Sequence, residues 1–576
     1  MKKNIKNMID LAAGRKKIEL VLKNCKVVNV FSNEVIEGDI AIDKGVIIGV
    51  GRYTGETEID IEGQYISPGL VDGHVHIEST MVTPNQFARA VVPRGTTTII
   101  TDPHEIANVC GVKGIEFMIN NSKELPLDVF FMLPSCVPAT PFENSGAVLE
   151  ADDYKELITN NRVLGLGELM NYPGVIEGNI KIIDKLLLAQ RHGKIVDGHG
   201  PEISDKDLNA YVIAGVKTDH ECSSIEEMLD RLRRGMYVLI REGTAARNLE
   251  VLIKAVTPQN ERRCMFCTDD KHPEGILKDG HIDNNVRLAI KNGIDPIAAI
   301  RMGSLNACEC YGLKNRGAIA PGYIADLIVI DNLKAFNILK VFKKGKVVAE
   351  NSKPLFDIET KLSSEVVGTV NAKEVTINDL KIKLNSDTAN VMKLIPHSIL
   401  TKKVVRKVNI DDGGIFTVNK DQDILKILVV ERHKATGNIG FGLVENFKLK
   451  GGAIASTVAN DSHNIVIIGD NDKDIYTAIN EVIRIGGGIT IVSNGEVLQT
   501  LELPIAGLIS DKSMEEVRDK LGKMLEIAYV KLGVNKELDP FMTLAFLALP
   551  VIPEIKVTDK GLFDVTEFKF IDIGII

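Results

Sequence analysis

Cysteine, positive charge and long apolar runs are all scarce in this sequence. Eight cysteines are spread irregularly over 576 residues, which excludes a secreted disulfide-rich scaffold and predicts reduced thiols. The net charge of −9 provides no global basic field for a nucleic-acid backbone, so we expect a small neutral or cationic ligand. No segment approaches the roughly 20 apolar residues that a membrane-spanning helix needs.

Targeting signals and low-complexity tracts are missing as well. The N-terminal stretch MKKNIKNMIDLAAGRKK is basic, but Asp10 interrupts its short apolar part, so it lacks a signal-peptide core. The composition, 44% hydrophobic and 26% charged, is that of a packed soluble protein. We therefore expect a soluble, cytoplasmic protein that binds neither nucleic acid nor membrane.

The length of the chain is too great for one hydrophobic core and predicts about three domains. Short β-rich runs separated by turn residues fill residues 18–66, and a similar texture returns at about 317–350. Neither flank alone has enough strands for a stable core. We therefore expect residues 1–66 and 312–355 to pair into one small β-sandwich domain; the alternative is two independent β extensions.

Between these flanks, eight apolar β-rich runs alternate with longer helical patterns, which indicates a parallel sheet. The runs cover residues 70–76, 96–102, 127–134, 162–168, 194–199, 216–220, 236–242 and 264–269. Their spacing is close to the βα repeat of a barrel of about 250 residues. We predict an α/β fold with a TIM-like (β/α)8 barrel over residues 67–311. From 360 to 576 the rhythm is lost and strands mix with helices, which predicts a C-terminal α+β domain.

Six side chains suited to metal binding stand at the ends of the predicted strands: His74, His76, Glu168, His199, His220 and Asp269. Side chains alternate faces along a strand, so the His-x-His pair projects from one side and can hold one cation. A barrel collects distant residues at the carboxyl ends of its strands. A single histidine would more often be a core residue, but the six together predict a metal centre.

Imidazole nitrogens and carboxylate oxygens suit a divalent ion such as Zn, Mn or Fe, and the sequence does not choose among them. We assign three of the six residues to one ion and two to a second, with Glu168 bridging: His74, His76 and Asp269 on the first, His199 and His220 on the second. A hydroxide shared by the two ions would be the nucleophile, because coordination lowers the pKa of water from about 15.7 towards about 7.

The segment TDPHE, after the second run, places three more ionisable residues at the same predicted rim. Asp102 and Glu105 are candidates for proton transfer, and His104 for substrate contact, since such groups near a metal acquire pKa values suited to acid–base work. The alternative is local: Asp102 could cap the following helix, with Glu105 completing a capping box.

Further candidates follow the later strands. Either Asp269 or Asp270 could ligate the metal, and we favour Asp269 because it ends the apolar run. We place Asp270 and His272 around the substrate, next to the ligands. Arg241 either contacts substrate or pairs with the neighbouring Glu242.

Two groups of motifs resemble known proteins. SPGLVDGHVHIEST and GAIAPGYIADLIVID, with the later His, His and Asp, resemble the amidohydrolase superfamily. Within it, the chain is similar to the adenine deaminase family through TDPHEIANVCG, LGLGELMNYPGV, DGHGP, TDHE, CTDDKHP and IASTVANDSHNIVIIG. Glu168 stands where many superfamily members have a carboxylated lysine, which argues against dihydroorotase- or hydantoinase-like enzymes. The family's C-terminal motif usually reads VAHDSHN; here Asn460 replaces its first histidine, and His463 is retained as a candidate substrate contact.

The resemblance implies hydrolysis of adenine to hypoxanthine and ammonia on a pair of Mn or Fe ions. Hydroxide would attack C6 while a proton reaches N1, with Asp269, Glu105 and Asp102 as the proton carriers. We expect a homo-oligomer whose C-terminal residues either close over the pocket or join subunits. Two alternatives are an amidohydrolase acting on a cyclic amide or N-acyl substrate, and a non-catalytic scaffold, against which the six retained ligands argue.

Overall fold

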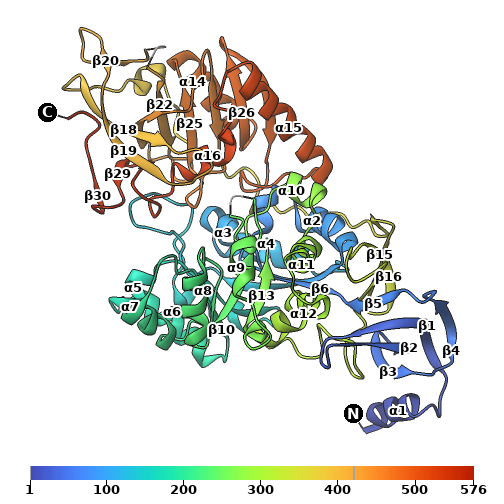
Figure 1. Ribbon diagram of the computed structural model, residues 1–576. Coiled ribbons are helices and arrows are strands. Elements are labelled where there is room, and N and C mark those ends of the chain that lie inside the picture. The colour runs from blue at the N-terminus through green and yellow to red at the C-terminus, as the bar shows by residue number, and fades with distance from the viewer. Residues whose placement is uncertain (1, 245, 420–421, 576) are drawn as a thin grey trace.

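A computed structural model describes residues 2–244, 246–419 and 422–575. Three regions follow one another across the molecule (Figure 1): an N-terminal sheet with helix α1 (Lys2–Ala12) at one end, a central barrel, and a C-terminal domain at the other end. Within these residues, no helix combines the length and apolar character needed to cross a membrane.

Strands from both flanks of the barrel form one nine-stranded sheet. Its members are β1 (Ile18–Asn29), β2 (Glu34–Asp43), β3 (Val46–Gly51), β4 (Gly55–Asp60), β5 (Tyr65–Pro68), β14 (Leu327–Ile330), β15 (Ile338–Lys343), β16 (Lys346–Glu350) and β17 (Lys353–Pro354). The two flanks join where β14 pairs antiparallel with β5. Ile47 of β3 and Phe342 of β15 belong to one buried cluster, so the sheet bends back over its own core as a two-layer sandwich does.

Eight parallel strands form the barrel: β6 (Leu70–Val75), β7 (Thr96–Thr101), β8 (Asp128–Leu133), β9 (Val163–Leu169), β10 (Ile195–Gly198), β11 (Thr218–Asp219), β12 (Tyr237–Arg241) and β13 (Cys264–Cys267). Hydrogen bonding groups them as β6 to β10 and β11 to β13. The Lys217 N–H donates to Val196 O (3.0 Å) between the groups, and a parallel bridge from Val75 to Asp269 joins the last strand to the first. Each of the eight predicted runs overlaps one of these strands, and seven contain the strand completely; β9 extends one residue beyond its run.

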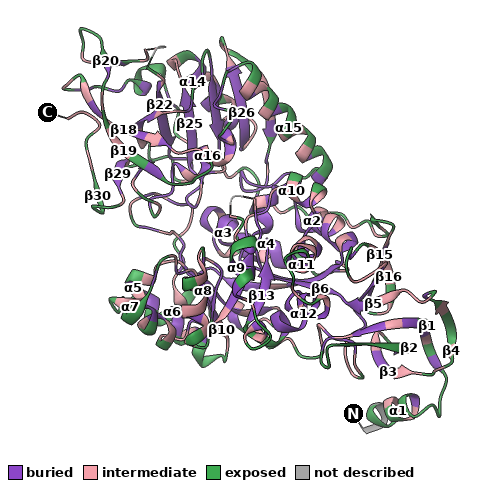
Figure 2. Ribbon diagram, in the orientation of Figure 1, coloured by how far each residue is buried: buried purple, intermediate pink, exposed green. Residues whose placement is uncertain are grey.

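Helices surround the strands: α2 (Pro84–Val91), α3 (His104–Cys110), α4 (Val112–Asn121), α5 (Tyr172–Ile176), α6 (Ile180–Arg191), α7 (Asp205–Ile213), α8 (Ile225–Arg233), α9 (Leu249–Leu252), α10 (Pro273–Lys278), α11 (Ile282–Lys291), α12 (Pro296–Met302) and α13 (Leu305–Cys310). Local sequence fixes their ends. At α8, Ser224 and Glu227 form a capping box that satisfies free N–H groups of the first turn. In Figure 2 the barrel strands are buried, whereas the outer helices expose one side.

The C-terminal domain is α+β. Its eight-stranded sheet contains β18 (Thr388–Leu394), β19 (Thr401–Lys407), β22 (Ile424–Val430), β23 (Ile439–Glu445), β24 (Ala453–Ser456), β25 (Ile465–Gly469), β26 (Gly488–Ser493) and β27 (Glu496–Glu502). The helices are α14 (Asp472–Arg484), α15 (Met514–Val530) and α16 (Pro540–Phe546). Two small sheets, β20 (Asn409–Ile410) with β21 (Phe416–Thr417), and β28 (Ile555–Thr558) with β29 (Gly561–Asp564) and β30 (Lys569–Phe570), complete it.

The loop after β8 ties the barrel to the C-terminal domain. Phe142 stacks on Phe563 of β29, with ring centroids 4.5 Å apart. Asn144 donates from its backbone N and its Nδ2 to the Asp559 carboxylate, at 2.8 and 2.5 Å. Asn464, between β24 and β25, donates to Asn144 O at 2.7 Å. The C-terminal domain therefore packs against a loop that leaves the carboxyl end of a barrel strand, the end at which such folds place their active sites.

Candidate metal centre

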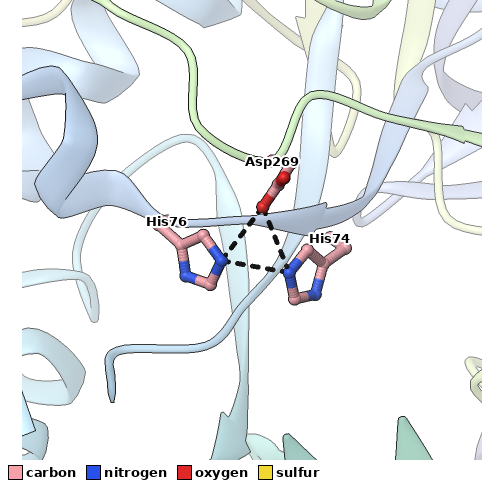
Figure 3. Close-up of side chains that lie close together, drawn as sticks. All are labelled: His74, His76 and Asp269. Carbon is pink, nitrogen blue, oxygen red and sulfur yellow. Dashed lines mark hydrogen bonds and ion pairs between the residues drawn. The ribbon is translucent and has the colours of Figure 1, made fainter. Parts of the chain in front are cut away.

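The His-x-His pair meets Asp269 at the mouth of the barrel. His74 Nε2 lies 3.1 Å from His76 Nε2, and Asp269 Oδ1 lies 3.6 and 3.1 Å from these two nitrogens. Figure 3 shows the three side chains converging from the ends of β6 and β13. All three are buried, with at most 6% exposure. The predicted ligands of the first ion therefore come together.

Glu168, at the end of β9, divides its two oxygens between two groups of histidines. Oε1 lies 3.2 Å from His76 Nε2 and 3.9 Å from His74 Nε2. Oε2 lies 2.8 Å from His199 Nδ1 and 3.2 Å from His220 Nε2. A carboxylate with this arrangement can bridge two cations.

The second group is more open to solvent than the first. The His199 side chain is 25% exposed, whereas His220 is 2% exposed. Glu221, which follows His220, lies 3.6 Å from His199 Nδ1 and 3.5 Å from His220 Nε2. Among the six proposed ligands, His199 therefore has the side chain most exposed to solvent.

Backbone geometry turns Asp269 into the mouth. Its φ of 54° lies in the left-handed region, which a residue other than glycine adopts only when its surroundings enforce it. The Asp269 N–H donates to His74 O at 3.0 Å, so the turn is fixed to the strand that carries the histidines. Arg241 Nη1 donates to Asp269 Oδ2 at 2.8 Å and also contacts Glu221.

The donor set fits a divalent metal. His76 Nδ1 lies 2.8 Å from the carbonyl oxygen of Asp102; since a carbonyl only accepts, Nδ1 carries the proton and a neutral ring turns the lone pair of Nε2 towards His74 and Asp269. The buried Nε2 of His220 lies 3.2 Å from Glu168 Oε2 and 3.5 Å from Glu221 Oε1, without a well-aligned hydrogen bond to either. A divalent cation held between these atoms would accept the lone pairs of the neutral rings. Each of the groups His74, His76, Asp269 and His74, Glu168, His220 keeps its ligand atoms within 4.8 Å of one another.

The electrostatics match that arrangement. Burial raises the pKa of the Glu168 carboxyl, but the His199, His220 and His76 imidazoles outweigh it and hold the pKa well below its usual range. Burial likewise raises the pKa of Asp269, and His74 and His76 outweigh it. Both carboxylates are therefore ionised and available as ligands.

A buried network behind the ligands joins the first barrel strand to the last. Asp72 Oδ1 accepts from the backbone N–H groups of His74 (3.2 Å) and Thr268 (3.1 Å). Its Oδ2 accepts from Thr268 Oγ1 at 2.5 Å and lies 3.1 Å from His281 Nε2. Asp72 therefore fixes the relative position of the strand ends that carry His74 and Asp269. Neither Asp72 nor His281 was predicted from the sequence.

Asp102 orients Glu168 rather than a helix. Its Oδ2 accepts from the Glu168 N–H at 3.0 Å, and helix α3 begins at His104 without a side-chain cap. The capping interpretation of Asp102 is therefore wrong. A Cβ on Gly167 would clash with Asp102 Oδ2, so the glycine allows this carboxylate to approach β9 closely.

His104 and Glu105 lie beside the metal ligands and meet a histidine of the C-terminal domain. His104 Nδ1 lies 3.3 Å from Glu168 Oε1, and His104 Nε2 lies 3.5 Å from Glu105 Oε1. Glu105 Oε2 lies 2.5 Å from His463 Nε2. Asp461, which was not predicted from the sequence, offers an oxygen to the group formed with His104 and Glu105. Burial raises the pKa of Asp461 to about 7.

The remaining candidates are placed differently. Asp270 accepts from Ser79 Oγ, so it is Asp269 and not Asp270 that faces the histidine pair. The His272 N–H donates to Thr244 Oγ1 at 2.8 Å at the start of α10. Burial lowers the pKa of the His272 ring, and the charge of Asp539 in the C-terminal domain opposes that shift. Arg241 bonds Glu221 and Asp269. Glu221 was also missed, although it directly follows His220 in TDHE.

Two family models match the chain. One, described as the amidohydrolase family, matches residues 65–348, and the other, described as the adenine deaminase C-terminal domain, matches residues 398–569. The adenine deaminase of Clostridium acetobutylicum is 58% identical over 568 residues, which are 98% of this chain and 100% of that protein. The adenine deaminase 2 of Carboxydothermus hydrogenoformans is 50% identical and covers 100% of both chains. Among solved structures, an enamidase of the amidohydrolase superfamily aligns with a TM-score of 0.44 at 21% identity over 58% of this chain and 97% of its own.

Proposed function

The chain belongs to the adenine deaminase family of amidohydrolases, and from this premise we propose that it hydrolyses adenine to hypoxanthine and ammonia at the barrel mouth. The observation that carries the proposal is the division of Glu168: one oxygen faces His74 and His76, and the other faces His199 and His220. Such a site is suited to hydrolysis because two cations can activate one water molecule.

We propose two divalent ions, Mn or Fe, as the cofactor. His74, His76 and Asp269 would hold one ion and His199 and His220 the other, with Glu168 shared. When bound, the ions supply a water molecule of lowered pKa for attack at C6. The mixed nitrogen and oxygen donor set supports this metal class.

Three carboxylates of the chain are the proposed proton carriers. The attacking water gives up two protons: Glu105 would deliver one to N1, and Asp269 would pass the other to the departing amino group, which leaves as ammonia. Asp102 is the third candidate carrier, and because it accepts the Glu168 N–H it would also keep that ligand in place. We assign substrate contacts to His104 and Asp270, which lie beside these groups.

For the whole molecule we propose a cytoplasmic homo-oligomer with domains at 1–66 plus 312–355, 67–311 and 360–576. Sedimentation of the purified protein tests the oligomeric state.

The test of the function is an ultraviolet assay of purified protein with adenine after reconstitution with Mn, Fe or Zn. Dihydroorotate, hydantoins and N-acetyl sugars form the comparison panel, which separates deamination from cyclic-amide or N-acyl hydrolysis. We expect ammonia from adenine alone. Cleavage of a panel member without deamination of adenine would replace the proposal, and a metal content well under one per chain would favour a non-catalytic scaffold.

Glu105→Gln tests the proton carrier separately. We expect a loss of about 10²- to 10⁴-fold in kcat, the usual contribution of a positioned acid or base, with both metals retained. Turnover at the wild-type level across pH, with both metals bound, would remove Glu105 from the mechanism.

A further inference from the structure

The C-terminal domain reaches into the barrel mouth through the loop between β24 and β25, residues 457–464. His463 in this loop is 1% exposed, and its Nε2 lies 2.5 Å from Glu105 Oε2. The distance is typical of a strong hydrogen bond to an ionised group. A side chain of one domain is thus fixed on a proposed proton carrier of another.

The other ring nitrogen of His463 determines which tautomer is present. The backbone N–H of Ala459 donates to His463 Nδ1 at 3.2 Å, so Nδ1 is an acceptor and carries no proton. The proton of a neutral ring must then be on Nε2, where it points at Glu105. Burial lowers the pKa of His463, which agrees with a neutral ring.

Glu105 is held between two imidazoles. Its Oε1 faces His104 Nε2 at 3.5 Å, and its Oε2 accepts from His463. Burial raises the pKa of this carboxyl, but His463 and His104 outweigh it and keep the pKa below its usual value. Glu105 is therefore ionised and fixed in one orientation.

Arg432, just after β22, holds the loop by hydrogen bonds to His463 and Asn464. Its Nε donates to His463 O, and its Nη2 donates to Ala506 O at 2.9 Å. Its backbone N–H donates to Asn464 Oδ1 at 3.2 Å. Among the described residues no carboxylate forms an ion pair with this fully buried guanidinium. Burying a charge without an ion-pair partner costs free energy. The hydrogen bonds of Arg432 to the loop backbone are therefore its structural role.

The loop needs this support because His463 has a φ of 54°, in the left-handed region. Next to Arg432, the His433 Nε2 lies 2.7 Å from Ser462 O. Asn464 in turn donates to Asn144 O in the barrel loop at 2.7 Å. The loop is therefore fixed on both sides.

We infer that His463 and Arg432 are positioning residues for deamination: Arg432 fixes the main chain of His463, and His463 donates its Nε2 proton to Glu105 and holds that carboxylate in place for proton transfer. The inference rests on the proposed function, in which Glu105 carries a proton.

The experiment compares four variants of the metal-loaded enzyme: His463→Leu, His463→Gln, Arg432→Met and Glu105→Gln. Leucine removes the donor, whereas the glutamine amide can place an N–H near the position of Nε2. We expect His463→Leu to lower kcat by up to about 100-fold, the cost of a misplaced catalytic group, with little change in KM, metal content or Tm, and His463→Gln to restore most of the loss. Arg432→Met should lower kcat in the same way. Arg406→Met is the matched control, because Arg406 lies on β19 and pairs with Glu445 at the surface.

A double-mutant cycle separates positioning from general destabilisation. If His463 acts through Glu105, adding His463→Leu to Glu105→Gln lowers kcat no further. Independent, multiplying losses, or a fully active His463→Leu, would overturn the inference. If the wild-type enzyme does not deaminate adenine, the proposed function fails, and proton NMR still decides the contact: a strongly deshielded N–H signal present in the wild type and absent from His463→Leu supports it, and no such signal refutes it.

Discussion

Arg241 holds one oxygen of Asp269 while the other oxygen faces the histidine pair. Arg241 Nη1 lies 2.8 Å from Asp269 Oδ2, and Asp269 Oδ1 lies 3.1 Å from His76 Nε2. The same guanidinium bonds both oxygens of Glu221. Arg241 thus links a ligand of the first group to a neighbour of the second, and its planar fork suits two carboxylates at once.

Replacing Arg241 with lysine should therefore weaken metal binding. Lysine keeps the charge but not the fork, so we expect a loss of about 10- to 100-fold in metal affinity or activity, the usual effect of removing a partner of a metal ligand. Metal titration with activity measurement checks this. Arg262→Lys is the control, because Arg262 pairs with Glu309 at the surface. Unchanged metal affinity in Arg241→Lys would contradict the role.

Glu168→Ala should empty at least one metal position and abolish deamination while the fold survives. The carboxylate contacts both groups of histidines, and its loss leaves each group one ligand short. Metal analysis combined with thermal melting checks the result. A fully loaded, active variant would remove the bridging assignment.

Gly167→Ala should disturb the site without touching a ligand. The new methyl group would clash with Asp102 Oδ2 and push that carboxylate from the Glu168 N–H. We expect destabilisation of about 1–3 kcal/mol from overpacking and lower activity. Equilibrium unfolding and kcat measure the two effects. Gly522→Ala, on helix α15, is the control for adding a methyl group, because a Cβ there meets no atom within 4 Å and its backbone is helical. A Gly167→Ala enzyme as active and stable as wild type would show that Asp102 can move freely.

Lys556 makes the stability depend on pH. Burial on β28 lowers its pKa from 10.5 to about 7, and its Nζ donates to Ile399 O at 2.9 Å. Below about pH 7 both states are protonated, and the folded state carries the buried charge. Between about pH 7 and 10.5 only the unfolded state binds the proton, so this group makes stability rise with pH.

Lys556→Met should remove that dependence. We expect the variant to be more stable than wild type near pH 6, by a few kcal/mol as an order of magnitude, and the difference to shrink towards pH 10. Tm measured across this pH range checks it. A difference in Tm between the variant and the wild type that stays constant across the pH range would show that burial does not lower the pKa of Lys556.

The six proposed ligands and the barrel could be predicted from sequence because they depend on local patterns. Each apolar run has strand length, and the ligand-type residue follows where the run ends, as at Glu168 and His220. Parallel strands then bring those ends to one rim. Asp269 could be chosen over Asp270 because it stands nearer to the last apolar residue of the run.

The contacts between domains could not be predicted in this way. His463 and Glu105 are 358 positions apart in the sequence. They meet because two domains pack together, and the alternation of apolar residues along a strand carries no information about that packing. Asp72 and His281 look like ordinary barrel residues in the sequence, since only the closure of the first strand on the last gives them a common role. Arg432 carries no motif either, because it acts through backbone carbonyl groups.

The uneven exposure of the histidines has a consequence for handling the protein. His74 and His76 are almost inaccessible, whereas a quarter of the His199 side chain meets solvent. An ion at the His199 end would leave and return readily, while one beside His74 would be trapped. Dialysis against a mild chelator should therefore strip the molecule in two phases, and preparations left half-loaded should be refilled from the outer position first.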